Sequence, residues 1–357
     1  YVPQDADQLM FYKETKDGQI LQEGINEAGA MADWIAAATA YSTHGVQMIP
    51  VYVFYSMFGM QRTMDLVWAA GDQRARGFLI GGTAGRTTLN GEGLQHEDGH
   101  SQVMAGMVPN CIAYDPTFAY EVAVVMQDGL RRMFAEQEDV FYYLTVMNEN
   151  YEHPAMPADS GSSGSSGSSV AADILKGMYQ FRKGAASNGA RVQLLGSGTI
   201  FMEAIAAAKL LHDDWGVEAD LWSCPSFNEL ARNGQDCERW NLLHPNEAPR
   251  VSHVTRCLAD TRGPVIAATD YIRLYAEQIR PMVCSQKSRS YRVLGTDGFG
   301  RSDTREQLRH FFEVNRYWIT LAALSALADD GQIDKGKVAE AIAKYALNPS
   351  KPNPVKV

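Results

Sequence analysis

The sequence MIPVYVFYSMFGMQRTMDLVWAAGDQRARGFLIGG, residues 48–82, decides the fold. It opens with a β-rich apolar run at 48–55, continues with a segment of helical spacing at 61–70, and closes with a short apolar run at 77–80. Strands that are apolar along their whole length are typical of parallel sheets, because helices cover both faces of such sheets. The stretch therefore predicts a strand–helix–strand unit of an α/β protein.

The same alternation continues on both sides of this stretch. In the first half of the chain we expect further strands at 111–114 and 140–146, and helices at 23–41 and 120–134. In the second half we expect strands at 192–196, 220–223, 264–269 and 291–295, and helices at 200–211, 271–280, 304–328 and 337–345. This pattern predicts two three-layer α/β/α domains with mostly parallel sheets.

A strict Gly-Ser-Ser repeat at 160–169 separates the two halves. Such a repeat cannot bury apolar surface and behaves as a flexible linker, and its regularity indicates an engineered segment. We therefore divide the chain into a domain at residues 1–158, a linker at 159–169 and a second domain at 170–357. The length of 357 residues agrees with this division, since a domain has roughly 150 residues.

The composition excludes several classes of protein. The chain has 32 Lys and Arg against 42 Asp and Glu, and the resulting charge of −10 argues against a nucleic-acid or basic membrane surface. No apolar run approaches the ~20 residues of a membrane span, and no signal peptide is evident. Five scattered cysteines without a C-x-x-C pair favour reduced thiols. We expect a soluble cytoplasmic protein and, because Tyr1 is not preceded by Met, a fragment of a longer one.

The segment His96-Glu97-Asp98-Gly99-His100 matches the H-E-x-x-H signature of zinc proteases. That signature requires a helix, which places both histidines on one face. Gly99 lies within the segment and Gly91 and Gly93 precede it, and each Gly costs a helix about 1 kcal/mol. We therefore expect a polar loop rather than a zinc site. A long loop at the carboxyl end of a parallel strand is nevertheless a common place for ligand chemistry, although a purely solvated loop remains an alternative.

Glu27 falls on the first predicted helix among small and apolar residues. A carboxylate held there would be desolvated and could share a proton with a basic nitrogen. The alternative is a glutamate on a solvated helix face. Tyr52, Tyr55 and Phe58 are likewise more often core aromatics than residues that stack on a cofactor.

Two glycine-rich segments follow predicted strands. Gly196-Ser197-Gly198 lacks the third glycine of a dinucleotide fingerprint, because Phe201 stands there, so a tight strand-to-helix turn is the better interpretation. The segment 295–300 is not followed by Gly-Lys-Ser/Thr and is no P-loop. Turn chemistry explains it.

Several longer motifs resemble one family, the homodimeric type of pyruvate dehydrogenase E1 component, which is a thiamine-diphosphate enzyme of the transketolase-like superfamily. The motifs are GINE at 24–27, YSMFG at 55–59, RTTLNGEGLQHEDGH at 86–100, MNENY at 147–151, the segment 226–240, and LGTDGFGRSD at 294–303. The resemblance covers nearly the whole chain apart from the Gly-Ser-Ser linker. It implies transketolase-like pyrimidine-binding and C-terminal domains.

The resemblance implies roles for four residues. Glu27 matches the glutamate that bonds N1′ of the cofactor's aminopyrimidine. Phe58 matches the aromatic residue that stacks on this ring, and Tyr55 lies close by. His96 matches the histidine that faces the substrate. Glu97, Asp98 and His100 are expected to support this site.

The implied reaction is decarboxylation of pyruvate, with transfer of the two-carbon unit to a lipoyl group on an E2 partner. The family binds the diphosphate and Mg²⁺ through a G-D-G motif in a preceding domain, and no such motif stands in this sequence. We therefore expect the metal ligands, an N-terminal domain and a second E1 subunit to complete the site. Two alternatives remain: a non-catalytic dimerisation or scaffold unit, and a zinc hydrolase built on the H-E-x-x-H segment.

Overall fold

The computed structural model describes residues 16–89, 93–158, 169–284 and 289–357. The elements before the predicted linker are α1 (Glu27–Ala38), α2 (Ala40–Thr43), β1 (Val51–Tyr55), α3 (Ser56–Asp72), β2 (Phe78–Gly82), α4 (Ser101–Met107), β3 (Cys111–Tyr114), α5 (Ala119–Leu130), a π-helical turn (Arg131–Ala135) and β4 (Phe141–Thr145). Those after it are α6 (Val170–Leu175), β5 (Tyr179–Arg182), β6 (Arg191–Gly196), α7 (Ile200–Trp215), β7 (Glu218–Ser223), α8 (Phe227–Leu243), α9 (His253–Leu258), β8 (Val265–Ala268), α10 (Leu274–Glu277), α11 (Arg280–Cys284), β9 (Tyr291–Leu294), α12 (Arg305–Phe311), α13 (Arg316–Asp329), α14 (Gly336–Lys344) and a 3-10 turn (Pro354–Lys356).

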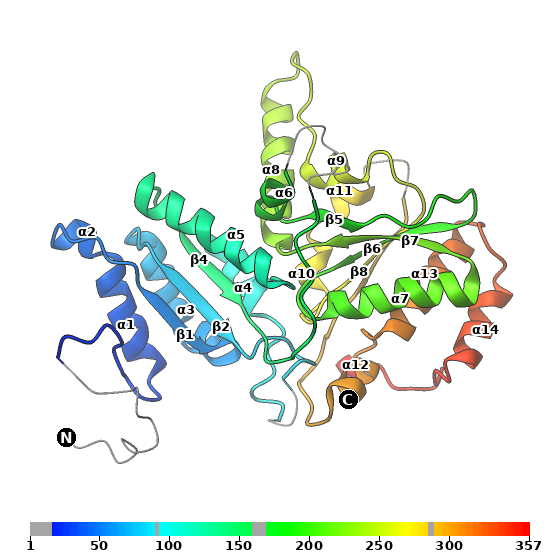
Figure 1. Cartoon of the computed structure of the whole chain (residues 1–357), viewed down its shortest axis with the longest axis horizontal. Coiled ribbons are helices and arrows are strands. Elements are labelled where there is room, and N and C mark those ends of the chain that lie inside the picture. The colour runs from blue at the N-terminus through cyan, green and yellow to red at the C-terminus, as the bar shows by residue number, and fades with distance from the viewer. Residues whose placement is uncertain (1–15, 90–92, 159–168, 285–288) are drawn as a thin grey trace.

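The strands form two sheets that lie side by side (Figure 1). The first has the order β1-β2-β4-β3 and the second the order β5-β7-β6-β8-β9. Every neighbouring pair is parallel except β5 and β7. The predicted class of two α/β domains with mostly parallel sheets is therefore confirmed.

Helices cover the first sheet unevenly. α1, α3 and α4 pack on one side, and α5 lies on the other (Figure 1). α1 buries Met31, Trp34 and Ala38, whose spacing places them on one helical face. The central strand β4 is buried along its whole length. The edge strand β1 is not, because the residues Val51 and Val53 are 50% and 64% exposed.

The second sheet is enclosed on both faces. α7 and α13 pack together on one side, and their apolar residues share a core with β6 and β7. α8, α9 and α11 contribute to a second core on the opposite side. α7 ends at Gly216, whose φ of +63° closes the helix in the left-handed conformation that glycine tolerates.

Several predicted helices are wrong in extent. The segment 23–41 becomes helical only at Glu27 and is divided into α1 and α2. The segment 271–280 contains only α10, and α11 begins at Arg280, because the preceding residues bond to other loops: Tyr271 O accepts from Thr296 N at 2.9 Å, and Ile272 N donates to Gly99 O at 2.8 Å. The segment 304–328 is divided into α12 and α13. Glu313 adopts a φ of +64° between them, and Asn315 caps α13 by accepting the N–H groups of Tyr317 and Trp318.

The chain around the predicted linker is only partly described. Residues 159–168 lie outside the described residues, so the domain boundaries remain a prediction. Val170 and Ile174 of α6 belong to the same apolar core as α1, α3 and α5 of the first domain. Within the described ranges, no helix combines the length and the apolar character that crossing a membrane requires.

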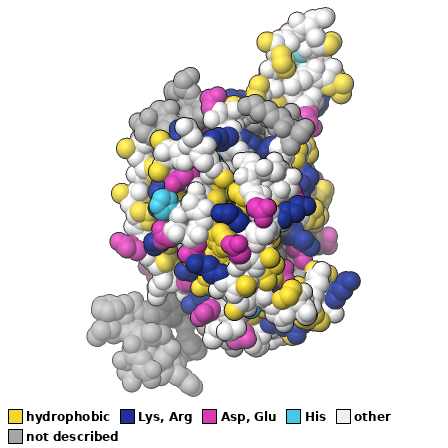
Figure 2. Space-filling model, turned by 90° about the vertical axis from the view of Figure 1, so that its right-hand side faces the viewer, with side chains coloured by type: hydrophobic (Ala, Val, Ile, Leu, Met, Phe, Trp, Pro, Cys, Tyr) yellow, Lys and Arg dark blue, Asp and Glu magenta, His cyan; other side chains and the backbone are white. Residues whose placement is uncertain are grey.

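Figure 2 shows one face of the molecule, on which acidic and basic side chains are interspersed. No large area of a single sign is visible on this face. Its appearance agrees with the moderate excess of acidic residues in the sequence, 42 against 32.

Candidate active site

Four residues singled out in the sequence lie near the carboxyl end of β1: Glu27, Tyr55, Phe58 and His96. The ring centroids of Phe58 and His96 are 4.9 Å apart, and those of Tyr55 and His96 are 5.8 Å apart. The ring centroids of Tyr55 and Phe58 are 6.2 Å apart. Arg62 joins this group to Glu27, and we name these five residues the aromatic–carboxylate cluster.

The local sequence explains why these side chains meet. Tyr55 is the last residue of β1, and α3 begins at the next residue, so Phe58 falls in the first turn of the helix. Asn26 caps α1 by accepting the N–H of Gly29 at 3.1 Å, which places Glu27 at the first helical position. Tyr55 pairs with Gly82, the residue from which the loop carrying His96 departs.

Arg62 was missed in the sequence. Its Nη1 donates to Glu27 Oε1 at 2.8 Å, and its guanidinium lies 4.3 Å from the centre of the Phe58 ring. Since Arg62 follows Phe58 by four residues in α3, helical spacing alone would have placed the two on one face. The sequence therefore contained a signal for this contact.

The cluster is open to solvent on one side. Tyr55 as a whole residue is 44% exposed and the Arg62 side chain is 53% exposed, whereas only 19% of the Glu27 side chain is exposed. Burial, together with the nearby charge of Glu27, raises the pKa of Tyr52 to about 12. The cluster thus combines a shielded carboxylate, two aromatic rings and an imidazole at an accessible surface.

The H-E-x-x-H segment forms turns rather than a helix, as predicted. His96 contacts the aromatic rings, whereas His100 Nε2 lies 2.9 Å from Gln61 Oε1. Asp98 accepts the N–H groups of His100 and Ser101 at 3.0 and 2.9 Å and so starts α4. Among the described residues, no group of three or more His, Cys, Asp and Glu side chains is arranged to hold a metal ion.

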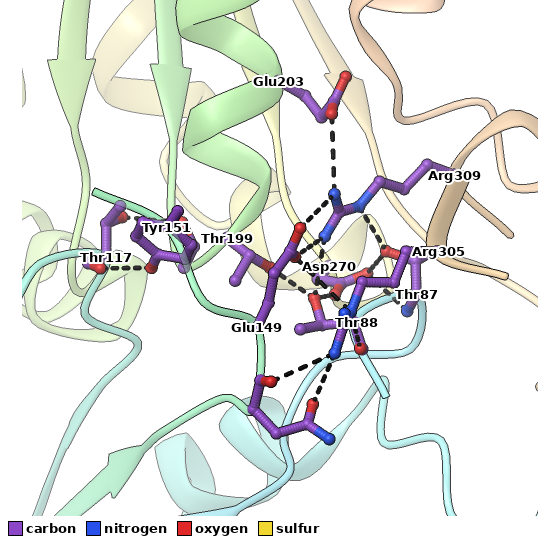
Figure 3. A network of polar contacts seen from close by, with 12 residues as sticks. Thr87, Thr88, Thr117, Glu149, Tyr151, Thr199, Glu203, Asp270, Arg305 and Arg309 are labelled. Atoms are coloured by element: carbon purple, nitrogen blue, oxygen red, sulfur yellow. Dashed lines mark hydrogen bonds and ion pairs between the residues drawn. The ribbon is translucent and has the colours of Figure 1, made fainter. Parts of the chain in front are cut away.

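The base of the His96 loop is fastened to the second domain. Asp270, which follows β8, accepts hydrogen bonds from Thr87 N at 2.9 Å, Thr87 Oγ1 at 2.7 Å and Thr88 Oγ1 at 2.6 Å (Figure 3). The Asp270 side chain is buried, and this burial raises its pKa, while Arg309 and the threonine donors oppose the change.

Arg309 extends the same network. From α12 it donates to both carboxylate oxygens of Glu149, and its Nη1 lies 3.7 Å from Glu203 of α7 (Figure 3). Only 7% of the Arg309 side chain is exposed. Arg305 adds a contact to Thr88 O at 2.6 Å. Segments from both domains thus share one set of polar contacts.

A second buried carboxylate, Asp115, joins the carboxyl ends of the two sheets. It follows β3 and accepts hydrogen bonds from Thr145 Oγ1 and Ser197 Oγ, both at 2.7 Å. Burial raises the pKa of Asp115 to about 7. Gly198 has a φ of +51°, and a Cβ there would lie 2.7 Å from the Asp115 carboxylate. The predicted strand-to-helix turn is confirmed, and its function here is contact between domains.

We call this set of buried and half-buried polar residues, which joins segments of the two domains, the interdomain joint. Its residues are Thr87, Thr88, Asp115, Thr145, Glu149, Ser197, Glu203, Asp270, Arg305 and Arg309. It contains none of the four residues predicted to act on cofactor or substrate.

Known proteins match both halves of the chain. The family of pyruvate dehydrogenase E1 component middle domains matches residues 1–154, and the transketolase-like C-terminal domain family matches residues 177–315. The pyruvate dehydrogenase E1 component of Cupriavidus necator is 73% identical over the whole chain, and that of Escherichia coli is 57% identical over 99% of it. The chain spans 38% of the length of each.

Solved structures of lower identity share the fold. Transketolase from Leishmania mexicana has a TM-score of 0.60 at 16% identity and covers 87% of this chain, which covers 38% of it. A split-gene transketolase, described as an inactive beta4 tetramer, has a TM-score of 0.53 at 14% identity, and the match covers 82% of this chain and 80% of that one. These structures show a shared fold. The matches in sequence show that residues 1–154 belong to the family of pyruvate dehydrogenase E1 component middle domains, and that the chain is 57–73% identical to a part of two curated pyruvate dehydrogenase E1 components.

Proposed function

We propose that this chain forms part of the E1 component of a pyruvate dehydrogenase complex and supplies one wall of a thiamine-diphosphate site. The observation that carries the proposal is the aromatic–carboxylate cluster, in which Glu27, Phe58 and His96 come from three separate segments and meet at an open surface. The relatives named pyruvate dehydrogenase E1 component support the assignment.

The cluster fits the aminopyrimidine part of the cofactor. Arg62 presents a planar group with N–H donors, which the Glu27 carboxylate and the Phe58 ring hold between them. An aminopyrimidine is also planar and also offers nitrogen atoms that carry protons. Glu27 would therefore hold the ring nitrogen, and Phe58 and Tyr55 would contact the ring. We place the ligands of Mg²⁺ in the N-terminal part of the enzyme.

Thiamine diphosphate, when bound, supplies the electron sink that decarboxylation of a 2-oxo acid requires. Glu27 holds a proton at N1′ of the aminopyrimidine ring. His96 holds or moves a proton at the carbonyl oxygen of the substrate, a task that suits an imidazole. The aromatic rings exclude water from one side of the site.

The partners follow from this assignment. Pyruvate is the substrate, and a lipoyl group on an E2 acyltransferase receives the two-carbon unit. A second E1 subunit, in a homodimer, and an N-terminal E1 domain would cover the open side of the cluster. Free thiols at all five cysteines support a reducing compartment, the cytoplasm.

A second candidate is a non-catalytic scaffold unit of the same enzyme. The split-gene transketolase favours it, because that protein matches this chain over most of both lengths and is described as inactive. The two candidates differ in whether the chain binds cofactor once the rest of the enzyme is supplied.

Calorimetric titration tests both candidates. Thiamine diphosphate and Mg²⁺ are titrated into the chain alone and into the chain mixed with a separately made N-terminal domain. We expect binding only in the mixture, loss of that binding with Glu27→Gln, and its retention with His96→Ala, which should instead abolish pyruvate turnover. Glu340→Gln, an exposed carboxylate of α14, is the matched control.

Binding in neither sample would favour the scaffold unit. Unchanged binding by Glu27→Gln in the mixture would contradict the role of this carboxylate, and equal loss of cofactor affinity in His96→Ala would contradict the division of roles.

A further inference from the structure

The segment that carries His96 rests on the second domain. Leu94 and Glu97 flank His96, and both contact Gly300 in the loop that follows β9. A Cβ on Gly300 would lie 2.8 Å from the carbonyl oxygen of Leu94 and 2.7 Å from Glu97 Oε2, closer than real Cβ atoms approach. The N–H of Arg301 donates to Glu97 Oε2 at 2.7 Å. Leu94 and Glu97 are therefore both held against the backbone of Gly300 and Arg301, which lies about 200 residues further along the chain.

The Glu97 carboxyl group is sealed from solvent, with an exposed fraction of 0%. Its Oε1 has no hydrogen-bond partner among the described residues. A buried anion with one N–H donor is costly, whereas a neutral acid in the same place costs much less. Accordingly, burial raises the pKa of Glu97 to about 8, with a smaller contribution from Asp270, while the N–H of Arg301 and the charge of Arg86 lower it.

In the part of the chain that the structure describes, no salt bridge joins Glu97 to an arginine, and the guanidinium of Arg301 lies 5.1 Å from the centre of the Phe311 ring. The charged and titratable groups around it belong to four segments and are Arg86, His96, Asp98, Asp270, Asp297 and Arg301. Arg86 donates to the carbonyl oxygens of Thr296 and Gly298 rather than to a carboxylate. Three aspartates act on this guanidinium in addition to Glu97. Ionised Glu97 would therefore add a negative charge to an already acidic interior.

We propose that Glu97 is a positioning residue for His96, acting as a neutral acid that anchors the His96 segment to the backbone of Gly300 and Arg301. This inference rests on the proposed function of His96. The second domain, which contributes none of the predicted catalytic side chains, thereby sets the position of one of them. Loss of the anchor frees Leu94–Glu97 from the second domain while the base of the loop stays bound to Asp270.

Hydrogen–deuterium exchange of the 357-residue chain tests the anchor without cofactor or substrate. We expect Glu97→Ala to increase amide exchange in the peptide spanning 94–100 about tenfold, the effect of one lost hydrogen bond. Gly300→Ala should do the same from the opposite side of the contact. Glu97→Gln keeps the size and neutrality of the acid and should restore most of the protection. Glu306→Gln, an exposed carboxylate of α12, controls for lost charge.

The dependence on pH separates positioning from general destabilisation. In the wild-type chain, exchange of this peptide should rise above about pH 8 beyond the intrinsic increase of unstructured peptide, and in Glu97→Gln it should not. In the complemented enzyme, which is this chain mixed with the separately made N-terminal domain, Glu97→Ala should lower kcat about tenfold and leave thiamine-diphosphate affinity unchanged. Glu97→Gln should keep most of the wild-type kcat.

Three outcomes would overturn the inference. The first is the same amide exchange of the 94–100 peptide in all variants, and the second is exchange in Glu97→Gln as fast as in Glu97→Ala. The third is a normal kcat in a variant enzyme whose 94–100 peptide exchanges faster than in the wild type. If instead the peptide responds as expected while the wild-type mixture neither binds cofactor nor turns over pyruvate, the anchor stands and the proposed function of His96 fails.

Discussion

The aromatic–carboxylate cluster and the interdomain joint use similar residue types in opposite ways. In the cluster, Tyr55 and Arg62 are about half exposed, and the Glu27 carboxylate pairs with Arg62 near the surface. In the joint, Asp115 and Asp270 are buried and each accepts several hydrogen bonds. The difference indicates that the joint stabilises the arrangement of domains, whereas the cluster leaves its groups available to a ligand.

Arg309→Ala in the joint should give the largest change. It removes the buried cation that donates to both oxygens of Glu149, whereas Glu203 keeps its closer partner Arg316 at 2.9 Å. Because the Glu149 side chain is also 22% exposed, the loss should lie near the lower end of the about 3–5 kcal/mol typical of breaking a buried ion pair. Chemical denaturation of the chain measures this loss. The matched control is Lys209→Ala, which removes an ion pair with Asp213 between side chains that are 76% and 45% exposed and should cost less than about 1 kcal/mol. Equal effects of the two variants would contradict the contrast between joint and surface.

Asp115→Asn should change how the stability of the joint depends on pH. Because the pKa of Asp115 is raised from 3.8 to about 7, the folded chain keeps this proton over a range in which the unfolded chain releases it. Its contribution to stability is full below about pH 4 and decreases towards pH 7, by at most about 1.4 kcal/mol per pH unit. The asparagine variant should remove this part of the slope in denaturation experiments between pH 4 and 7. An unchanged slope would show that Asp115 is ionised throughout.

Phe58→Ala in the cluster should give the smallest change in stability but a measurable change in binding. The ring contacts the guanidinium of Arg62 and the imidazole of His96, and stacking of this kind contributes about 1–1.5 kcal/mol beyond the lost area. Calorimetry on the complemented enzyme should therefore show roughly tenfold weaker thiamine-diphosphate binding. Wild-type affinity in this variant would remove the ring from the proposed site.

Most of the sheet framework could be predicted from local sequence. The apolar runs that became β1 to β4 and β6 to β9 were visible because each is short, apolar and bounded by turn residues. β5 was missed, since Gln180 and Arg182 give it the composition of a loop. The break between α12 and α13 was missed for the opposite reason: Phe311, Phe312 and Val314 continue the helical pattern although Glu313 leaves the helical conformation.

The candidate site could be predicted only in part. Tyr55, Phe58 and Arg62 are close in sequence, and strand and helix spacing place them together. The contact of Glu97 with Gly300 joins segments far apart in the chain, and no periodic pattern connects them. The resemblance to a known family supplied the residues expected to carry the chemistry, since spacing and composition alone favoured ordinary positions for Glu27, Tyr55 and Phe58. Neither could show which parts of the second domain hold the His96 segment in place.

The exposed edge strand of the first sheet has a consequence for how copies of the chain meet in solution. β1 is an edge strand, and the exposed apolar residues Val51 and Val53 could contact a neighbouring copy of the chain. At neutral pH the charge of −10 keeps such copies apart, but this repulsion vanishes near the isoelectric point of about 5.3 and is screened by salt. We therefore expect light scattering to show dispersed chains in dilute buffer above pH 7 and self-association on acidification, which Val53→Lys should reduce.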